Sequence, residues 1–188
     1  RKSGEIDPRH NIDFAWFTKA EARSLIPADP QPGRSYPAPA FFPKRIARCH
    51  LIDTVRGQSA HWRDENIQNA DITLTVENIT PDHIHLCLEG EIKNEAKPTF
   101  DVNPFSEQVV DKPRGVDLKL LGYLRFNTHQ ESFETFDLVA AGPRWGATTY
   151  NARFDDVGPA PIGFAFEIAS RTPIDRTPPA AIGSGYFS

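Results

Sequence analysis

One stretch of the sequence gathers residue types that bind metals or transfer protons: residues 83–91, His-Ile-His-Leu-Cys-Leu-Glu-Gly-Glu. Apolar and polar residues alternate there, and in a β-strand every second side chain points to the same face. We therefore predict a strand with His83, His85, Cys87, Glu89 and Glu91 on one face, opposite an apolar face. Imidazole, thiolate and carboxylate groups are ligands of first-row metals. Two histidines at this spacing lie about 7 Å apart along a strand, close enough to reach one ion.

The spacing His83-x-His85-x-x-x-Glu89 resembles the first metal-binding motif of the cupin superfamily over seven residues. In that family two histidines and a glutamate, joined by a later histidine, hold iron, manganese or another divalent ion within a β-barrel. The resemblance implies a metal-dependent enzyme that uses His83, His85 and Glu89, with His50 or His129 as the fourth ligand.

The chain departs from the cupin pattern further along. The family's later element, Pro-x-Gly-x-x-His, begins at Pro161-Ile162-Gly163, but Phe164-Ala165-Phe166 follows in place of a histidine. A second interpretation therefore stays open. If the apolar face of the strand forms the core, its histidines and glutamates are an ordinary solvated sheet surface, and the protein needs no cofactor.

A second group of residues suits the binding of a glycan or another small molecule. Trp62 stands in a polar segment, and Arg144, Trp145 and Tyr150 follow a predicted strand. Exposed Trp and Tyr side chains on a β scaffold offer flat apolar platforms, and a nearby Arg supplies hydrogen-bond donors. The alternative is that Trp145 fills the end of a barrel or caps its core.

Cys49 and Cys87 are the only cysteines. Both fall in predicted strands, so a disulfide between them would tie two strands together. It would close a loop of about 38 residues and contribute roughly 3–4 kcal/mol. The alternative is a pair of small, half-buried thiols.

The elements that position these residues are mostly strands. Two-residue alternation predicts strands over 46–55, 71–77, 83–93, 116–126, 132–141 and 161–169, with a short one over 147–150. No β-α-β alternation is present, which argues against a parallel sheet. Antiparallel strands with one apolar face pack those faces together in a barrel or a sandwich. We therefore predict a mainly β fold, an antiparallel β-barrel or curved β-sandwich of about seven strands.

The ends of the chain differ from this body. The sequence Thr18-Lys19-Ala20-Glu21 is a capping box, which predicts a short helix that ends before Pro27. Six prolines in 27–43 favour an extended strap that packs on the main body. We predict three parts: helix and strap over 1–44, an antiparallel β domain over 45–170, and a loose or wrapping tail over 171–188.

Composition narrows the function classes. The length of 188 residues suits roughly one domain. The net charge is −4 and the pI about 5.9, without the basic face that nucleic-acid binding needs. No apolar run approaches the 18 residues of a membrane span. The chain starts at Arg1 and contains no Met, and we interpret it as a mature or excised chain of secreted or periplasmic origin.

Our first functional hypothesis is a non-enzymatic β domain that binds a small ligand or glycan through Trp62, Arg144, Trp145 and Tyr150. It would be one module of a larger extracytoplasmic protein. The first alternative is the cupin-like enzyme with a divalent metal. The second is a structural domain that contacts another domain, or a second copy of itself, through residues 1–44.

Overall fold

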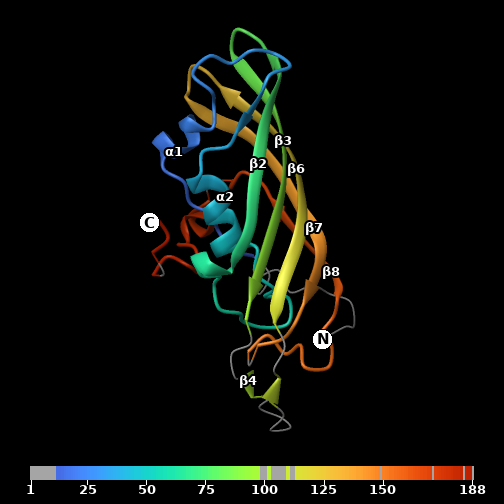
Figure 1. The fold of residues 1–188 in the computed structure, drawn as a ribbon. Coiled ribbons are helices and arrows are strands. Elements are labelled where there is room, and N and C mark those ends of the chain that lie inside the picture. Colours follow the sequence, from blue (N-terminus) through green and yellow to red (C-terminus); the bar gives the residue numbers. More distant parts are fainter. Residues whose placement is uncertain are drawn as a thin grey trace.

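The computed structural model describes residues 12–97, 101–102, 109–110, 113–148, 150–170, 172–183 and 185–187. Its main feature is a six-stranded antiparallel sheet with the strand order β1-β2-β3-β6-β7-β8 (Figure 1). The strands are β1 (Ser35–Pro37), β2 (Ile67–Ile79), β3 (His83–Ala96), β6 (Arg114–Asn127), β7 (Ser132–Trp145) and β8 (Ala160–Phe166). A separate two-stranded sheet joins β4 (Asp101–Val102) to β5 (Val109–Val110).

Short helices cover one face of the main sheet (Figure 1). They are α1 (Lys19–Ser24), α2 (Phe41–Arg45) and a π-helix, η2 (Ile46–His50), which continues α2 directly. Two 3₁₀ turns, η3 (Asp64–Asn66) and η4 (Pro173–Arg176), lie in the connections. The capping box of α1 is confirmed. The Thr18 hydroxyl accepts from the Glu21 N–H at 3.1 Å, and the Glu21 carboxylate accepts from the Thr18 N–H at 2.8 Å.

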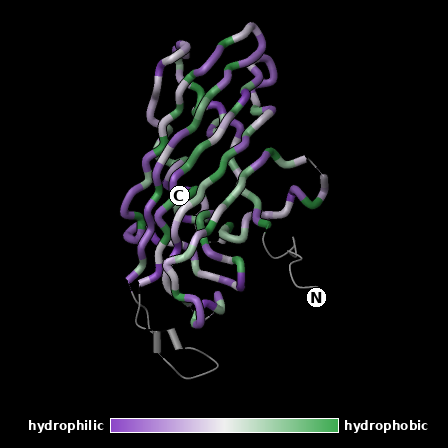
Figure 2. Tube along the Cα trace, turned by 90° about the vertical axis from the view of Figure 1, so that its right-hand side faces the viewer, coloured by the Kyte–Doolittle hydropathy of each residue, from purple (hydrophilic) through white to green (hydrophobic). Residues whose placement is uncertain are grey.

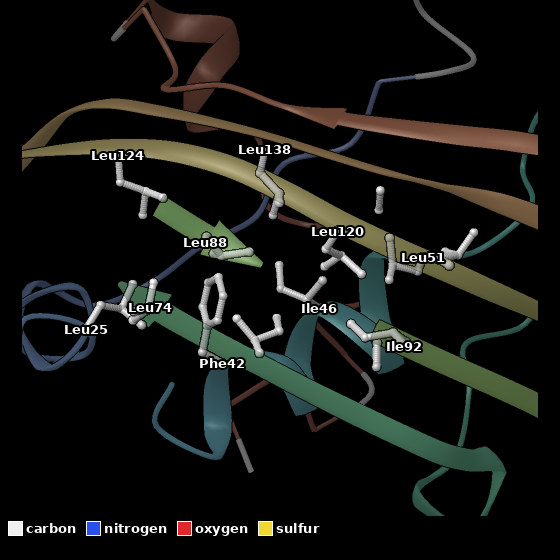
Figure 3. Close-up of a cluster of buried hydrophobic side chains, with 14 of the residues drawn as sticks. Leu25, Phe42, Ile46, Leu51, Leu74, Leu88, Ile92, Leu120, Leu124 and Leu138 are labelled. Atoms are coloured by element: carbon white, nitrogen blue, oxygen red, sulfur yellow. The ribbon is translucent and has the colours of Figure 1, made fainter. Parts of the chain in front are cut away.

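The core lies between the sheet and these helices. Along the middle of the long strands, alternate residues are buried on one face, which we call the inner face. Figure 2 shows the alternation of hydrophilic and hydrophobic residues along these strands. Phe42 and Ile46, from α2 and η2, lie among the inner-face leucines of the sheet (Figure 3). Those labelled in the figure are Leu74, Leu88, Leu120, Leu124 and Leu138.

The prediction of a mainly β, antiparallel fold is confirmed, but the sheet is not closed. Strands β1 and β8 form its two edges, so a barrel is not confirmed. Within the described ranges the layer facing the sheet consists of helices and chain ends, where a sandwich would have a second large sheet.

Two strand predictions are wrong: residues 147, 148 and 150 of the short predicted strand lie in a connection, and 46–55 is not a strand. The error at 46–55 explains why no second sheet faces the first. Residues 46–50 form the π-helix, and no strand covers 51–55. The buried residues Phe42, Ile46 and Cys49 recur at intervals of four and three, which is the spacing of one helix face. Taken alone, the apolar residues of 46–55 fit a strand, and their helical spacing is visible only together with 41–45.

The proline-rich segment 27–43 is not one extended strap. It supplies edge strand β1 and the first turn of α2. Pro37 ends β1, where an edge strand tolerates a residue without an N–H. Pro43 lies in the first turn of α2, where backbone N–H groups have no partner within the helix.

Candidate functional site

An open depression of about 480 Å³ lies where the π-helix meets the segment that precedes β2. Arg48 and Cys49 of η2 line one side, and residues 61–65 line the other. π-Helical turns are rare and are found frequently at functional sites. Of the residues singled out from the sequence as ligand-binding, Trp62 is the one that lines this depression.

Hydrogen bonds to backbone carbonyls of η2 and of the residue after it fix both sides of the depression. The Trp62 N–H donates to the Arg48 carbonyl at 3.1 Å, and the Trp62 indole N–H donates to the Leu51 carbonyl at 2.8 Å. The buried Asn94 of β3 donates from its amide to the Ala47 carbonyl at 2.9 Å. Because these contacts use carbonyls at and after the π-helix, the depression has a fixed floor.

The charged groups of the depression are partly paired. Arg48 lies 3.5 Å from the Asp64 carboxylate and also donates to the Gly185 carbonyl. Lys44 lies 2.9 Å from Asp64, and its hydrogen bond lowers the pKa of that carboxyl. Asp64 is therefore ionised at neutral pH, beside two cations.

The opposite side combines an imidazole with a looser ion pair. Burial lowers the pKa of His61, so its ring is mainly neutral at neutral pH. Arg63 and Glu65 lie 3.6 Å apart at the solvent edge. Below them the Arg114 guanidinium stacks on the Trp62 ring, 4.1 Å from its centre. The depression thus presents hydrogen-bond donors and acceptors side by side.

A chain of three polar side chains from distant parts of the sequence runs from the exposed Asp13 through His50 of η2 to the buried Tyr186. The Asp13 carboxylate lies 3.2 Å from Nδ1 of His50, and Nε2 of His50 lies 2.7 Å from the Tyr186 hydroxyl. That hydroxyl also accepts from the Trp16 N–H at 2.9 Å. Burial raises the pKa of Tyr186 to about 12, so the phenol stays protonated. These groups satisfy one another and fasten both terminal segments to η2.

Arg45 of α2 forms a second set of contacts that hold both terminal segments to the helices, and we call this set the Arg45 fastening. Its guanidinium contacts the Glu21 carboxylate through two nitrogens, at 2.6 and 3.1 Å, and donates to the Tyr186 carbonyl at 3.0 Å. The hydrogen bond from Arg45 lowers the pKa of Glu21 to about 2. Four aromatic rings surround the guanidinium at 5.0–5.5 Å: Phe17, Phe41, Tyr186 and Phe187.

The four predicted ligand-binding residues do not share one cavity. Trp145 lies on the outer face of the sheet, where its ring covers Gly115 of the neighbouring strand. Tyr150 is 76% exposed in a connection. Arg144 is only 2% exposed and is bound by carboxylates.

Arg144 belongs to a buried ion cluster. The sequence allows Arg144 and Arg153 to pair with Asp155 and Asp156 on the surface, but it gives no sign of the buried Asp53. Arg153 binds both carboxylate oxygens of Asp53, at 2.9 and 3.0 Å, and lies 2.9 Å from Asp156. Arg144 contacts Asp156 as well, and its Nε lies 3.9 Å from Asp53. The cluster joins the segment after η2 to the segment after β7, about a hundred residues apart in sequence.

The predicted metal ligands lie on the outer face of β3, as the alternation indicated. The rings of His83 and His85 are 6.3 Å apart, and His83 lies 3.2 Å from Glu134 of β7. Glu89 is six residues from His83 along a regular strand, a separation of about 20 Å. Among the described residues no group of three or more His, Cys, Asp or Glu side chains has a geometry that could hold a metal ion.

The two histidines considered as fourth ligands lie elsewhere. His50 is on the inner side of the sheet, bound to Asp13 and Tyr186. His129 lies in the turn after β6, 2.9 Å from Asp82.

The two cysteines are free and lie on different sides of the sheet. Cys49 is buried with Ala181 and Tyr186 on the helical side. Cys87 lies on the outer face of β3, where burial raises the pKa of its thiol. The disulfide interpretation is therefore wrong, because the segment that carries Cys49 is a helix on the inner face.

Comparisons with known proteins assign no family to this chain. No model of a known protein family matches the chain, and no curated protein or solved structure matches it either. In the described part of the chain, no helix is long and apolar enough to cross a membrane.

Proposed function

We propose that this chain is a non-enzymatic β domain that binds a small polar ligand, of the sugar class, in the depression between η2 and residues 61–65. The observation that carries the proposal is the depression itself, with its volume of about 480 Å³ and its hydrogen-bonded floor. Ligand sites are concave, largely preformed, and equipped with a few convergent polar groups.

The chemistry of the lining supports a sugar. Hydroxyl groups both donate and accept hydrogen bonds. Arg48 and Arg63 supply donors, Asp64 and Glu65 supply acceptors, and the neutral imidazole of His61 lies in the same lining. Binding is favoured over catalysis because the nearby Asp13–His50–Tyr186 chain is internally satisfied and its phenol is held in the protonated form.

Calorimetric titration with a panel of neutral and acidic oligosaccharides tests the proposal. We expect His61→Ala to weaken binding by about fivefold, since the loss of one polar contact between the lining and the ligand is worth roughly 1 kcal/mol. Tyr150→Ala is the matched control, because this aromatic residue lies outside the depression, and it should bind like the wild type.

Trp145→Ala tests our sequence-based site against the depression. Unchanged affinity in a folded Trp145→Ala variant supports the depression. Loss of binding in Trp145→Ala or Tyr150→Ala, with His61→Ala unaffected, would instead place the site near Trp145. Absence of binding to every member of the panel would contradict the sugar class.

A further inference from the structure

We propose that the sugar bound in the depression carries an acidic group, a carboxylate, sulfate or phosphate, and that this group lies in a second, smaller hollow. The inference rests on the proposed function, because it assigns the charge of the ligand of that same site. The second hollow has a volume of about 130 Å³. A water molecule needs about 10–15 Å³ by the same measure, so the hollow admits a group of several atoms. The residues that line it are Glu21, Phe41, Lys44, Arg45, Arg48 and Phe187.

The two hollows meet along the helix that α2 and η2 form together. Arg48 lines both of them. Lys44, which lines the second hollow, lies 2.9 Å from Asp64, which lines the depression. Lys44 and Arg48 are four residues apart, so their side chains are neighbours on the helix surface. A sugar in the depression can therefore extend an acidic group past Asp64 to these two cations.

The charges around the two hollows leave a positive excess that suits an anion. Among the described residues, four cations and three carboxylates line the hollows: Lys44, Arg45, Arg48 and Arg63 against Glu21, Asp64 and Glu65. Arg45 pairs with Glu21, and Arg63 lies near Glu65. The two remaining cations share one carboxylate, that of Asp64. This local excess is found in a chain whose net charge is −4.

Lys44 is the cation best placed to contact an incoming acidic group. Its side chain is 42% exposed, whereas that of Arg48 is 11% exposed and also donates to the Gly185 carbonyl. An ammonium group has three N–H donors, so Lys44 can contact Asp64 and a ligand anion at the same time. Hydrogen bonds between ionised groups are roughly twice as strong as those between neutral groups. Lys44 therefore makes the contact that distinguishes acidic from neutral sugars.

Calorimetric titration with matched pairs of trisaccharides tests this inference. The members of each pair have the same rings, and one member carries acidic groups: trigalacturonate against its methyl ester, and sulfated or phosphorylated cellotriose against cellotriose. We expect the acidic member of at least one pair to bind about fivefold tighter or more, and the preferred pair identifies the acidic group. The preference should shrink between about 0.01 M and about 0.15 M ionic strength, because the Debye length falls from about 30 Å to about 8 Å.

Two substitutions with opposite effects sharpen the test. Lys44→Gln should lower the ratio of acidic to neutral affinity about fivefold, because it removes the cation that contacts the acidic group. Asp64→Asn keeps an oxygen acceptor but removes the competing negative charge, so it should raise this ratio. Lys119→Gln is the matched control, since it makes the same change of charge on the outer face, where the side chain is 87% exposed. It should leave the ratio unchanged.

The possible results separate this inference from the proposal on which it rests. Equal affinity within every pair would overturn the inference and leave the sugar proposal in place. An acidic preference that Lys44→Gln does not reduce would overturn it as well. If neither member of any pair binds, both the inference and the proposed function are contradicted. Circular dichroism of each variant confirms that it is folded.

Discussion

The two faces of the main sheet are built from the same strands but differ in what covers them. The inner face lies under α1, α2 and η2, with both terminal segments fastened there by Arg45 and by the Asp13–His50–Tyr186 chain. The outer face of β3, β6 and β7 carries rows of exposed polar groups around an apolar centre. Alternation within a strand predicts that two faces will differ. Which face receives a site depends on the connections, and here these gather on the inner side.

Asp53→Ala should produce the largest loss of stability, because it removes a buried carboxylate shared by Arg153 and Arg144. The variant leaves two arginines in a buried cluster without this carboxylate, which should lower the free energy of unfolding by about 3–5 kcal/mol. Urea unfolding measures this change. Asp155→Ala is the control, because Asp155 pairs with Arg56 in solvent and such pairs contribute under about 1 kcal/mol. Equal effects of the two variants would contradict the assignment of the cluster as buried.

Leu138 and Val139 compare the two faces at adjacent positions. Leu138 is buried on the inner face, and Leu138→Ala should destabilise the fold by about 2–5 kcal/mol. Val139 is 53% exposed on the outer face, and Val139→Ala should change stability by less than about 0.5 kcal/mol. The same unfolding measurement serves both variants. A large loss in Val139→Ala would show that the outer face is covered in solution.

Acid should weaken the fastening at Glu21 and Arg45. The pKa of Glu21 is lowered in the folded chain to about 2, from an ordinary value of 4.5. A lowered folded-state pKa stabilises the fold above pH 4.5, and this contribution is lost as the pH falls toward 2. Discounted for partial exposure, it is on the order of 2 kcal/mol. Stability measured from pH 6 to pH 2 should fall more in the wild type than in Glu21→Gln. Parallel curves would contradict the fastening.

The smallest effect is expected for a histidine substitution on the outer face, and it tests whether the outer face of β3 binds a metal ion. With His83 held by Glu134 and Glu89 far along the strand, we expect His85→Ala to leave both metal content and thermal stability unchanged. Plasma mass spectrometry of both proteins after incubation with divalent ions measures this. One equivalent in the wild type that is absent from His85→Ala would restore the cupin-like interpretation.

Local signals in the sequence predicted local structure well. The capping box at Thr18 and the strands around residues 71–77, 83–93, 116–126 and 132–141 are present. These features depend on side chains a few residues apart. The strand prediction for 46–55 was wrong because a short apolar run fits one face of a helix as well as it fits a strand.

The candidate site was only partly predictable, because it depends on contacts between distant segments. Trp62 was singled out, but its neighbours in the depression come from a helix that was expected to be a strand. The pairing of Asp53 with Arg153 spans a hundred residues, and that of His50 with Tyr186 spans 136. The acidic Asp155-Asp156 pair after Arg153 was the one available signal, and it is equally typical of a solvated loop.

The most direct test of the central claim, that the inner side of the sheet carries the function, is an amide NMR titration with the sugar panel. We expect the shifted resonances to map to Arg48, Cys49 and residues 61–65, with the outer-face residues 83–91 unchanged. Shifts confined to residues 83–91, shifts around Trp145 and Tyr150, or no shifts with any sugar would contradict the account.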